Sequence, residues 1–196
     1  MAVRAVLASA NPKKVAEIHE ILGGSLDLVT RPPEVPEVVE DAPTFVGNAR
    51  LKAAALVAAT GLAALADDSG IEVDALGGEP GVRSARYAGA DASDQDNVTK
   101  LLEALADRPD PAERSARFRC VLVLQHPDGG EVVVDGAVEG HIAPAPRGSS
   151  GFGYDPVFVP AEGDGRTFAE MDPAEKHAMS HRGRALAALL RAVEPG

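Results

Sequence analysis

The segment VRAVLASANPKKVAEIHEIL, residues 3–22, decides the fold class of this sequence. Its first part, residues 3–8, is a short apolar run of the kind that forms a buried strand. Pro12 is suited to the first turn of a helix, and apolar residues then recur at helical spacing as far as Leu22. A buried strand that leads through a short polar turn into a helix is typical of an α/β protein.

The rest of the chain continues this pattern. Further strands are predicted at residues 26–29 and 62–66, further helices at 44–60, 93–106 and 180–193, and an exposed Pro- and Glu-rich loop at 31–43. Two valine-rich segments, 116–126 and 131–142, flank Pro127-Asp128-Gly129-Gly130, as in a β-hairpin. Because helices and strands alternate early and the hairpin comes late, the sequence predicts an α/β fold with a mixed sheet flanked by helices.

The composition is that of a globular protein with an acidic surface. The 196 residues are 45% hydrophobic and 25% charged, so they can form one substantial core, or two small lobes that share one sheet, and are not typical of a disordered chain. The formal net charge of −11 speaks against general nucleic-acid binding, which needs a basic surface. It permits a small anionic substrate where a few cations converge. We therefore expect one domain over residues 1–196 that binds no nucleic acid.

Membrane and redox features of the sequence favour the cytoplasm. The longest apolar stretch, residues 53–66, is shorter than the roughly 20 residues that a membrane-spanning helix needs. The N-terminal residues lack the pattern of a signal peptide. Cys120 is the only cysteine, so no internal disulfide is possible and a reducing compartment fits best. We expect a cytoplasmic protein with no membrane partner.

The polar turn after the first strand is the first candidate site. Ser9-Ala10-Asn11-Pro12-Lys13-Lys14 places backbone N–H groups at a helix N-terminus, where phosphate binds readily, and Lys14 adds a positive charge. The turn does not have the glycines and the Gly-Lys-Ser/Thr ending of a Walker A motif. A polar N-cap followed by lysines that face solvent is the alternative interpretation.

Two adjacent carboxylates follow the strand predicted at residues 62–66, in Asp67-Asp68-Ser69-Gly70. The carboxyl end of a strand faces the crevice in which α/β proteins bind ligands. Carboxylate oxygens suit Mg²⁺, and a carboxylate can also accept a proton from an attacking water. Because side chains alternate along a strand, only one of the two would face a given cleft unless the segment turns. These four residues are also good turn formers, so a simple turn is the alternative.

Two further charged positions lie nearby in the sequence. Glu40-Asp41 lies in the Pro-rich loop, where a mobile second metal ligand could sit, and Lys52 lies on the helix that follows. A solvated acidic loop and a surface lysine explain these residues equally well.

Glycines and aromatic residues gather at Gly151-Phe152-Gly153-Tyr154-Asp155-Pro156, in a chain with only 4% aromatics. Glycines allow close backbone approach, and an aromatic face can stack on a nucleobase. An aromatic loop that packs on its own domain is the alternative. Lys176 and Ser180-His181-Arg182 follow, and their donors could bind a phosphate or the carbonyl of a base. An N-cap with exposed His181 and Arg182 would explain the last of these motifs equally well.

Together and in this order, these motifs resemble the inosine/xanthosine triphosphate pyrophosphatases, the Ham1-like non-canonical purine triphosphatases. The resemblance covers essentially the whole chain. It is also carried by Thr44-Phe45 with Asn48-Ala49, by Lys52-Ala53, by Asp74-Ala75-Leu76-Gly77-Gly78, by Pro80-Gly81 and by Ser84-Ala85-Arg86-Tyr87. It implies an elongated α/β fold with a long mixed sheet, two lobes and a deep central cleft, usually as a homodimer. It also implies Mg²⁺-dependent hydrolysis of ITP, dITP and XTP to the monophosphate and pyrophosphate, which cleanses the nucleotide pool.

The same resemblance implies roles for individual residues. Asp68 would be the catalytic proton acceptor and a metal ligand, and Glu40, with Asp41 as the alternative, would be the second metal ligand. The residues implied to bind the substrate are Ser9, Ala10, Asn11, Pro12, Lys13, Lys14, Lys52, Ser69, Phe152, Gly153, Tyr154, Asp155, Lys176, His181 and Arg182.

The implied base pocket would select purines by their six-position. Lys176, His181 and Arg182 would donate hydrogen bonds to the six-carbonyl of hypoxanthine or xanthine, whereas adenine would place an amino donor against these donors. Three other functions stay open. A pyrophosphatase with another base preference would share the fold and the metal chemistry. A nucleotide-binding module would bind without turnover, and a general Mg²⁺ phosphatase would release orthophosphate.

Overall fold

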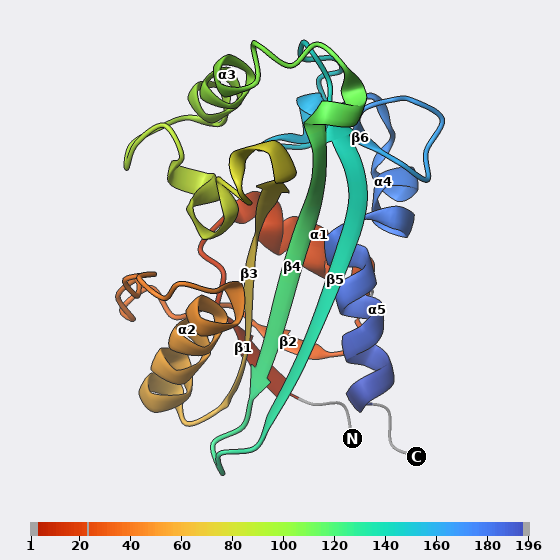
Figure 1. The fold of residues 1–196 in the computed structure, drawn as a ribbon. Helices are drawn as coiled ribbons and strands as arrows, with labels where there is room; N and C mark the ends of the chain where they lie inside the picture. Colours follow the sequence, from red (N-terminus) through yellow and green to blue (C-terminus); the bar gives the residue numbers. More distant parts are fainter. Residues whose placement is uncertain (1–3, 23, 194–196) are drawn as a thin grey trace. The chain divides into compact units, whose positions relative to one another are not determined.

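The computed structural model describes residues 4–22 and 24–193 (Figure 1). The helices are α1 (Pro12–Leu22), α2 (Phe45–Thr60), α3 (Asp94–Ala104), α4 (Pro173–Met179) and α5 (His181–Val193). The strands are β1 (Arg4–Leu7), β2 (Asp27–Val29), β3 (Ala63–Val73), β4 (Ser115–Gln125), β5 (Glu131–Ile142) and β6 (Phe158–Pro160).

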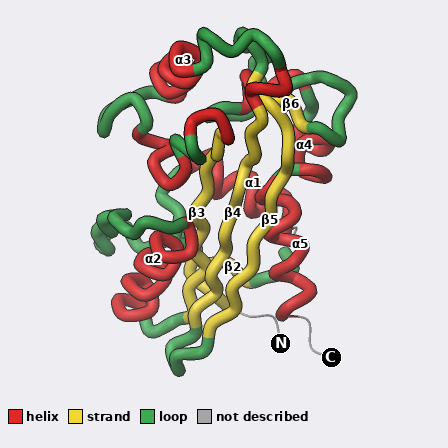
Figure 2. The backbone as a smooth tube through the Cα atoms, in the orientation of Figure 1, coloured by secondary structure: helices red, strands yellow, loops and turns green. Residues whose placement is uncertain are grey.

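All six strands join one mixed sheet in the order β2-β1-β3-β4-β5-β6 (Figure 2). β1 runs parallel to β2 and to β3, whereas β6 runs antiparallel to β5. The predicted α/β fold with a mixed sheet flanked by helices is therefore confirmed. In the described part of the chain, no helix combines the length and the apolar character needed to cross a membrane.

The chain divides into two compact units, each built from separate stretches of sequence. Of the described residues, unit 1 holds 4–22, 24–68, 120–136 and 182–193, and unit 2 holds 69–119 and 137–181. β3, β4 and β5 each contribute residues to both units. The single domain, the elongated form and the deep cleft between two lobes stay predictions.

In unit 1 the sheet lies between helices (Figure 1). Leu65 of β3 packs in one buried cluster with Ile18 of α1 and Leu186 of α5. Its neighbour Ala66 packs in another cluster, with Leu56 of α2. Successive residues of β3 therefore face opposite sides of the sheet, one covered by α1 and α5 and the other by α2. This alternation decides where the two carboxylates that follow Ala66 point.

Unit 2 has its own core, in which aromatic rings gather. Phe118, Phe158 and Phe168 are buried together, and the ring centroids of Phe118 and Phe158 lie 4.7 Å apart. The rings of Phe118 and Phe168 stack at 6.0 Å. Three of the five phenylalanines of the chain therefore lie in this core. Contacts between aromatic rings stabilise a core beyond the burial of their apolar surface.

The starts of α2 and α3 agree with the predicted helices at residues 44–60 and 93–106. Thr44 caps α2 by accepting from the backbone N–H of Gly47, and Gly61 ends that helix with a left-handed φ of 69°. Ser93, the first residue of the helix predicted at 93–106, caps α3 in a capping box with Asp96. These signals are local, so the sequence alone could carry them.

The strand predicted at residues 62–66 continues beyond its predicted end, and one helix was not predicted. Residues 67–70 form no turn, because β3 continues without a break through Val73. The helix α4, capped by Asp172, was not predicted because its seven residues are too few to show a helical period. Val3, predicted as the start of the first strand, lies outside the described residues.

Candidate active site

The two adjacent carboxylates of β3 point to opposite faces of the sheet in unit 1. Asp67 lies on the side of α1 and α5, where Lys14 Nζ is 2.9 Å from Asp67 Oδ2. Asp68 lies on the side of α2, where Lys52 Nζ is 3.3 Å from Asp68 Oδ1. The alternation expected of a strand is thus present, and it gives two neighbouring carboxylates different surroundings. Matching cations on each side allow the strand to continue through these buried charges.

Asp67 belongs to a buried chain of alternating charges. Arg182 Nη2 lies 3.7 Å from Asp67 Oδ2, and Arg182 also forms an ion pair with Glu17 of α1. Burial acts to raise the pKa of Asp67, but the charges of Lys14, Arg182 and Lys52 outweigh burial and hold the pKa well below its usual range. Asp67 therefore stays charged, and it holds Lys14 and Arg182 in place.

For Asp68, the effect of burial on the pKa outweighs the effect of the neighbouring cations. Burial raises the pKa of the Asp68 carboxyl above its usual range, and the nearby Glu40 adds to this. The charges of Lys52 and Lys14 and a hydrogen bond from Asn48 offset only part of the effect. Neighbouring carboxyl groups whose pKa values are pushed apart are typical of sites with divided acid–base roles. In this pair, Asp68 is the group suited to accept a proton.

Lys52 joins the Pro-rich loop to β3. Its Nζ lies 3.2 Å from Glu40 Oε2 and 3.3 Å from Asp68 Oδ1, so one ammonium contacts both carboxylates. Burial acts to lower the pKa of Lys52, but the charges of Asp67, Asp68 and Glu40 raise it on balance, so Lys52 remains a cation. Half-buried Glu40 makes this contact, whereas its neighbour Asp41 is exposed.

The carboxylates of Glu40 and Asp68 have the chemistry of magnesium ligands. Within residues 4–22 and 24–193, no three side chains of His, Cys, Asp or Glu gather as a cage for a metal ion. Mg²⁺ is usually held by one or two carboxylates together with water and the phosphates of a substrate, so a pair is sufficient. These residues therefore fit Mg²⁺, although its binding stays a prediction.

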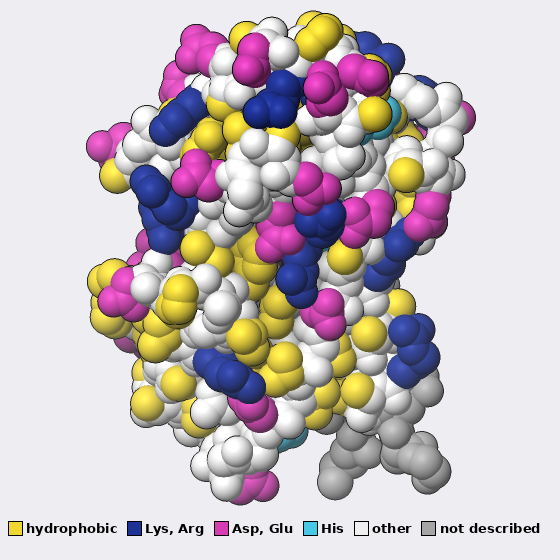
Figure 3. Space-filling model, in the orientation of Figure 1, with side chains coloured by type: hydrophobic (Ala, Val, Ile, Leu, Met, Phe, Trp, Pro, Cys, Tyr) yellow, Lys and Arg dark blue, Asp and Glu magenta, His cyan; other side chains and the backbone are white. Residues whose placement is uncertain are grey.

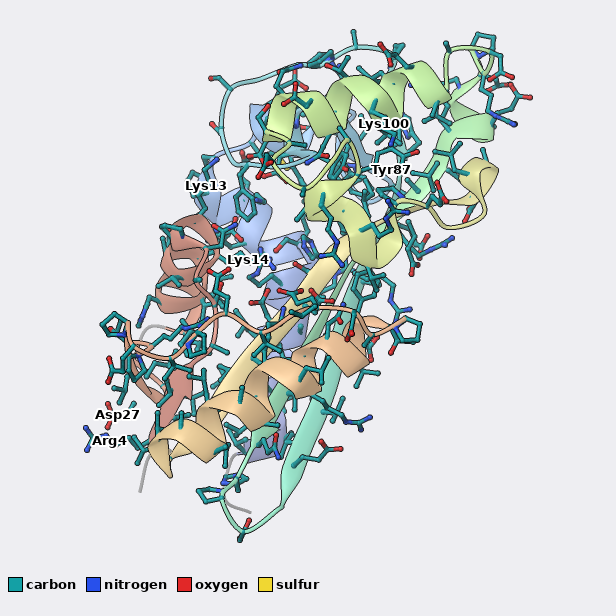
Figure 4. The ribbon with its side chains drawn as sticks, turned by 90° about the vertical axis from the view of Figure 1, so that its left-hand side faces the viewer. Arg4, Lys13, Lys14, Asp27, Tyr87 and Lys100 are labelled. Carbon is teal, nitrogen blue, oxygen red and sulfur yellow. The ribbon has the colours of Figure 1, made fainter. Side chains whose placement is uncertain are left out.

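The predicted phosphate-binding turn is held by its own side chains. Asn11 Oδ1 accepts from the backbone N–H groups of Lys13 at 2.9 Å and of Lys14 at 3.3 Å, while Ser9 Oγ accepts from Asn11 N. Asn11 therefore caps α1, and two amides predicted to face a phosphate already have a partner. Lys13 and Lys14 bring the positive charge to this first turn (Figure 4). The other predicted members of the turn are the exposed Ala10 and Pro12.

Unit 2 brings together part of the predicted base pocket. Lys176 Nζ lies 2.7 Å from Asp155 Oδ2 and 5.0 Å from the centre of the Phe152 ring. Asp155 Oδ2 also accepts from Phe152 N at 2.8 Å. A Cβ at Gly151 would lie 2.1 Å from this same oxygen, so the loop requires glycine there. The result is a buried lysine and carboxylate beside an aromatic ring.

The remaining predicted residues of unit 2 are mostly packed. The Tyr154 hydroxyl donates to the backbone oxygen of Ser84 at 2.8 Å within the core. The His181 ring stacks on Phe118 with centroids 4.6 Å apart. The alternative of an exposed His181 and Arg182 is wrong, because both side chains are buried. Gly153 donates its backbone N–H to Asp94, and Ser69 is half-buried in β3.

Two residues next to these charges were not predicted as site residues. Asn48 of α2 is fully buried and donates from Nδ2 to Asp68 Oδ2 at 3.1 Å. Glu17 pairs with Arg182 and lies one helical turn after Lys14 on α1. The sequence shows an asparagine within a predicted helix and the i, i+3 spacing of Lys14 and Glu17, but neither pattern indicates that Asn48 contacts Asp68 or that Glu17 contacts Arg182.

On the face drawn in Figure 3, Lys and Arg side chains are interspersed with Asp and Glu. The described side chains on that face form no continuous basic surface of the kind that general nucleic-acid binding needs. This agrees with the net charge of −11.

Comparisons with known proteins agree in family and in fold. The model of the Ham1 family matches residues 5–192. A dITP/XTP pyrophosphatase of Symbiobacterium thermophilum is 51% identical over 95% of this chain and 93% of that protein, and one of Vibrio cholerae is 50% identical over 96% of both. Among solved structures, a HAM1 protein from Coxiella burnetii is 45% identical, covers 97% of this chain and 98% of its own, and superposes with a TM-score of 0.87.

Proposed function

The chain belongs to the Ham1 family, and on this basis we propose that it hydrolyses non-canonical purine nucleoside triphosphates to the monophosphate and pyrophosphate. The relatives named dITP/XTP pyrophosphatase share about half of the chain's residues over nearly its whole length, which supports dITP and XTP as substrates, with ITP as the ribose counterpart. Removal of these nucleotides would cleanse the nucleotide pool.

The observation that carries this proposal within the structure is the division between Asp67 and Asp68. Asp67 has a lowered pKa, is charged at neutral pH and holds Lys14, whereas Asp68 has a raised pKa and lies beside Glu40 and Lys52. Phosphoryl transfer needs fixed cations for the phosphates and a group that takes a proton from the attacking water. This cluster supplies both in one unit.

The residues of the cluster then have separate roles. Asp68 accepts a proton as the water oxygen bonds to phosphorus, the anhydride bond breaks and pyrophosphate leaves. Lys14 and Lys52 neutralise charge that develops on the phosphate oxygens. Glu40 and Asp68 would hold Mg²⁺, which supplies further charge neutralisation when it is bound. In a chain with a net charge of −11, capture of a triphosphate depends on this local charge.

Base selection is proposed to rest on the group in unit 2. Lys176 offers an ammonium with three donor hydrogens beside Phe152, and Asp155 holds it in place. A six-carbonyl would accept from this group, whereas the six-amino group of adenine would bring a donor against donors. Arg182, predicted for the same pocket, is engaged in unit 1 by Glu17 and Asp67, which supports a positioning role.

We expect dITP and XTP to be hydrolysed with a kcat/KM at least about 100-fold above that of ATP, since a mismatched buried donor is strongly rejected. Initial rates on dITP, XTP, GTP, ATP and CTP measure this, with Lys176→Met as the variant that should weaken the preference. Equal rates on all five nucleotides would contradict the assigned selectivity. Preference for a modified pyrimidine would favour the related pyrophosphatase, and tight binding without turnover would favour the binding module.

A cytoplasmic location fits an enzyme that acts on the nucleotide pool, and the homodimer usual for the family is proposed for this chain as well. Both belong to the same proposal.

A further inference from the structure

Asn48 links two parts of the proposed site. It lies in the first turn of α2, and its side chain is fully buried. Its Nδ2 donates to Asp68 Oδ2 at 3.1 Å, and its Oδ1 accepts from the backbone N–H of Ala42 at 3.0 Å. One side chain therefore contacts both the carboxylate on β3 and the loop that carries Glu40.

The neighbouring residue of α2 independently fixes the same loop. A Cβ at Gly47 would lie only 2.7 Å from the Cβ of Ala42, so the loop approaches the helix more closely than any other residue type would allow. Thr44, the N-cap of α2, accepts from Gly47 N. The start of α2 is thus shaped to receive the backbone at Ala42, two residues after Glu40.

The chemistry of an amide side chain suits this link. Asparagine can donate and accept at once, whereas an aspartate would accept only and an aliphatic residue would do neither. A donor to Asp68 Oδ2 leaves Oδ1 directed at Lys52, so the carboxylate has one partner on each oxygen. Burial of an asparagine side chain is costly unless its carbonyl oxygen and its amino group are both hydrogen-bonded. Both groups of Asn48 have a partner, Oδ1 in Ala42 N and Nδ2 in Asp68 Oδ2.

We propose that Asn48 is a positioning residue that sets the orientation of the Asp68 carboxylate and holds the Glu40 loop against α2. This inference rests on the proposed function, because it assigns Asn48 to the reaction carried out by Asp68. Asn48 acts through the Asp68 carboxylate and through the loop that carries Glu40, and it does not itself touch the reacting atoms.

Two substitutions separate its two bonds. Asn48→Asp keeps an acceptor for Ala42 N but loses the donor to Asp68. We expect it to lower kcat for dITP by about 100-fold, the cost of a misplaced catalytic group, with KM changed by less than about threefold. Asn48→Ala loses both bonds. We expect it also to weaken Mg²⁺ binding to the substrate-free protein by about tenfold, the lower end of the effect of losing a group that orients a metal ligand.

A third variant tests the loop without touching the amide. Gly47→Ala pushes on Ala42 and should raise the Mg²⁺ concentration needed for half-maximal rate while leaving the bond from Asn48 to Asp68 in place. Hydrogen exchange at the Ala42 amide should be faster in Asn48→Ala and in Gly47→Ala, and unchanged in Asn48→Asp.

Unit 2 offers a matched control in Asn97. This buried asparagine of α3 accepts from Ala88 N at 2.8 Å and donates to Ala85 O at 3.1 Å, but it contacts no carboxylate in those bonds. Asn97→Asp and Asn97→Ala should lower the melting temperature as much as the Asn48 variants do, while kcat stays within about threefold of the parent because no reacting group is displaced.

Failure of the positioning role of Asn48 can be distinguished from failure of the proposed function. If the parent protein releases pyrophosphate and the Asn48 variants match the Asn97 variants in kcat and in Mg²⁺ affinity, the positioning role is overturned and the proposed function stands. If the parent shows no turnover but Asn48→Ala still loses Mg²⁺ affinity and exposes the Ala42 amide, the proposed function fails and the link through Asn48 stands. Calorimetry with MgCl₂ alone supplies the readout that does not depend on turnover.

Discussion

Replacement of Asp68 by Asn should lower kcat by about 100- to 10,000-fold, the range that removal of a general base covers, while dITP still binds. The substitution keeps the size of the side chain but removes its capacity to take a proton. Steady-state kinetics with Mg²⁺ and equilibrium binding of dITP measure the two parts separately. Near-normal turnover in Asp68→Asn would remove this residue from its assigned role.

Asp67→Asn is the variant against which the stability of Asp68→Asn is compared, because Asp67 is the adjacent residue and faces the opposite side of the sheet. Its pKa is lowered on folding, so its charge stabilises the protein at neutral pH and this stabilisation is lost as the pH falls. Removal of this charge takes away the carboxylate with which Lys14 and Arg182 form ion pairs. We expect this to lower the free energy of unfolding by about 3–5 kcal/mol.

The effect of Asp68→Asn on stability should have the opposite sign. Because the pKa of Asp68 is raised on folding, its ionised form opposes folding at neutral pH, and this penalty disappears as the pH falls below the usual range of an aspartate. Thermal unfolding with a chelator present should therefore give a higher melting temperature for Asp68→Asn than for the parent, and a lower one for Asp67→Asn. A lower melting temperature in both variants would contradict the division of roles between them.

Removal of divalent metal should abolish turnover. We expect EDTA to lower the rate on dITP by about 1,000-fold or more, because charge neutralisation by a metal contributes several kcal/mol to phosphoryl transfer, and excess Mg²⁺ should restore it. Lys52 contacts both proposed ligands, Glu40 and Asp68, so two carboxylates share one ammonium, and bound Mg²⁺ would neutralise the negative charge that is left.

A pair of variants assigns the second ligand. Glu40→Gln should raise the Mg²⁺ concentration for half-maximal rate by about tenfold, while Asp41→Asn should leave it unchanged, because Glu40 reaches Lys52 and Asp41 is exposed. Full activity in EDTA would contradict the metal requirement. A larger effect of Asp41→Asn than of Glu40→Gln would transfer the ligand role to Asp41.

Much of the fold could be predicted because its signals are local. Pro12 at the start of α1, Thr44 before α2 and Ser93 before α3 mark helix ends within a few residues of themselves. The turn between β4 and β5 likewise lies within its own residues, with His126 N bonded to Gly130 O at 2.8 Å. Such signals can be read from one stretch of sequence without knowledge of any other.

The features that could not be predicted depend on distant partners. Asp67-Asp68 has good turn chemistry, yet it continues β3 because Lys14 and Lys52, on two different helices, neutralise the carboxylates. Asn48 has partners 6 and 20 residues away, and nothing near it in the sequence names them. Arg182 forms ion pairs with Glu17 and Asp67, which lie far from it in the sequence, so its place next to His181 did not indicate these partners.

The central claim is that the chain splits a purine triphosphate into the monophosphate and pyrophosphate, and product analysis tests it most directly. Purified protein with Mg²⁺ would be given dITP, and the phosphate products would be separated and counted against the nucleotide consumed. The account predicts one dIMP and one pyrophosphate for each dITP, with no orthophosphate at early times. Release of orthophosphate with dIDP, or persistence of dITP at high enzyme concentration, would contradict it.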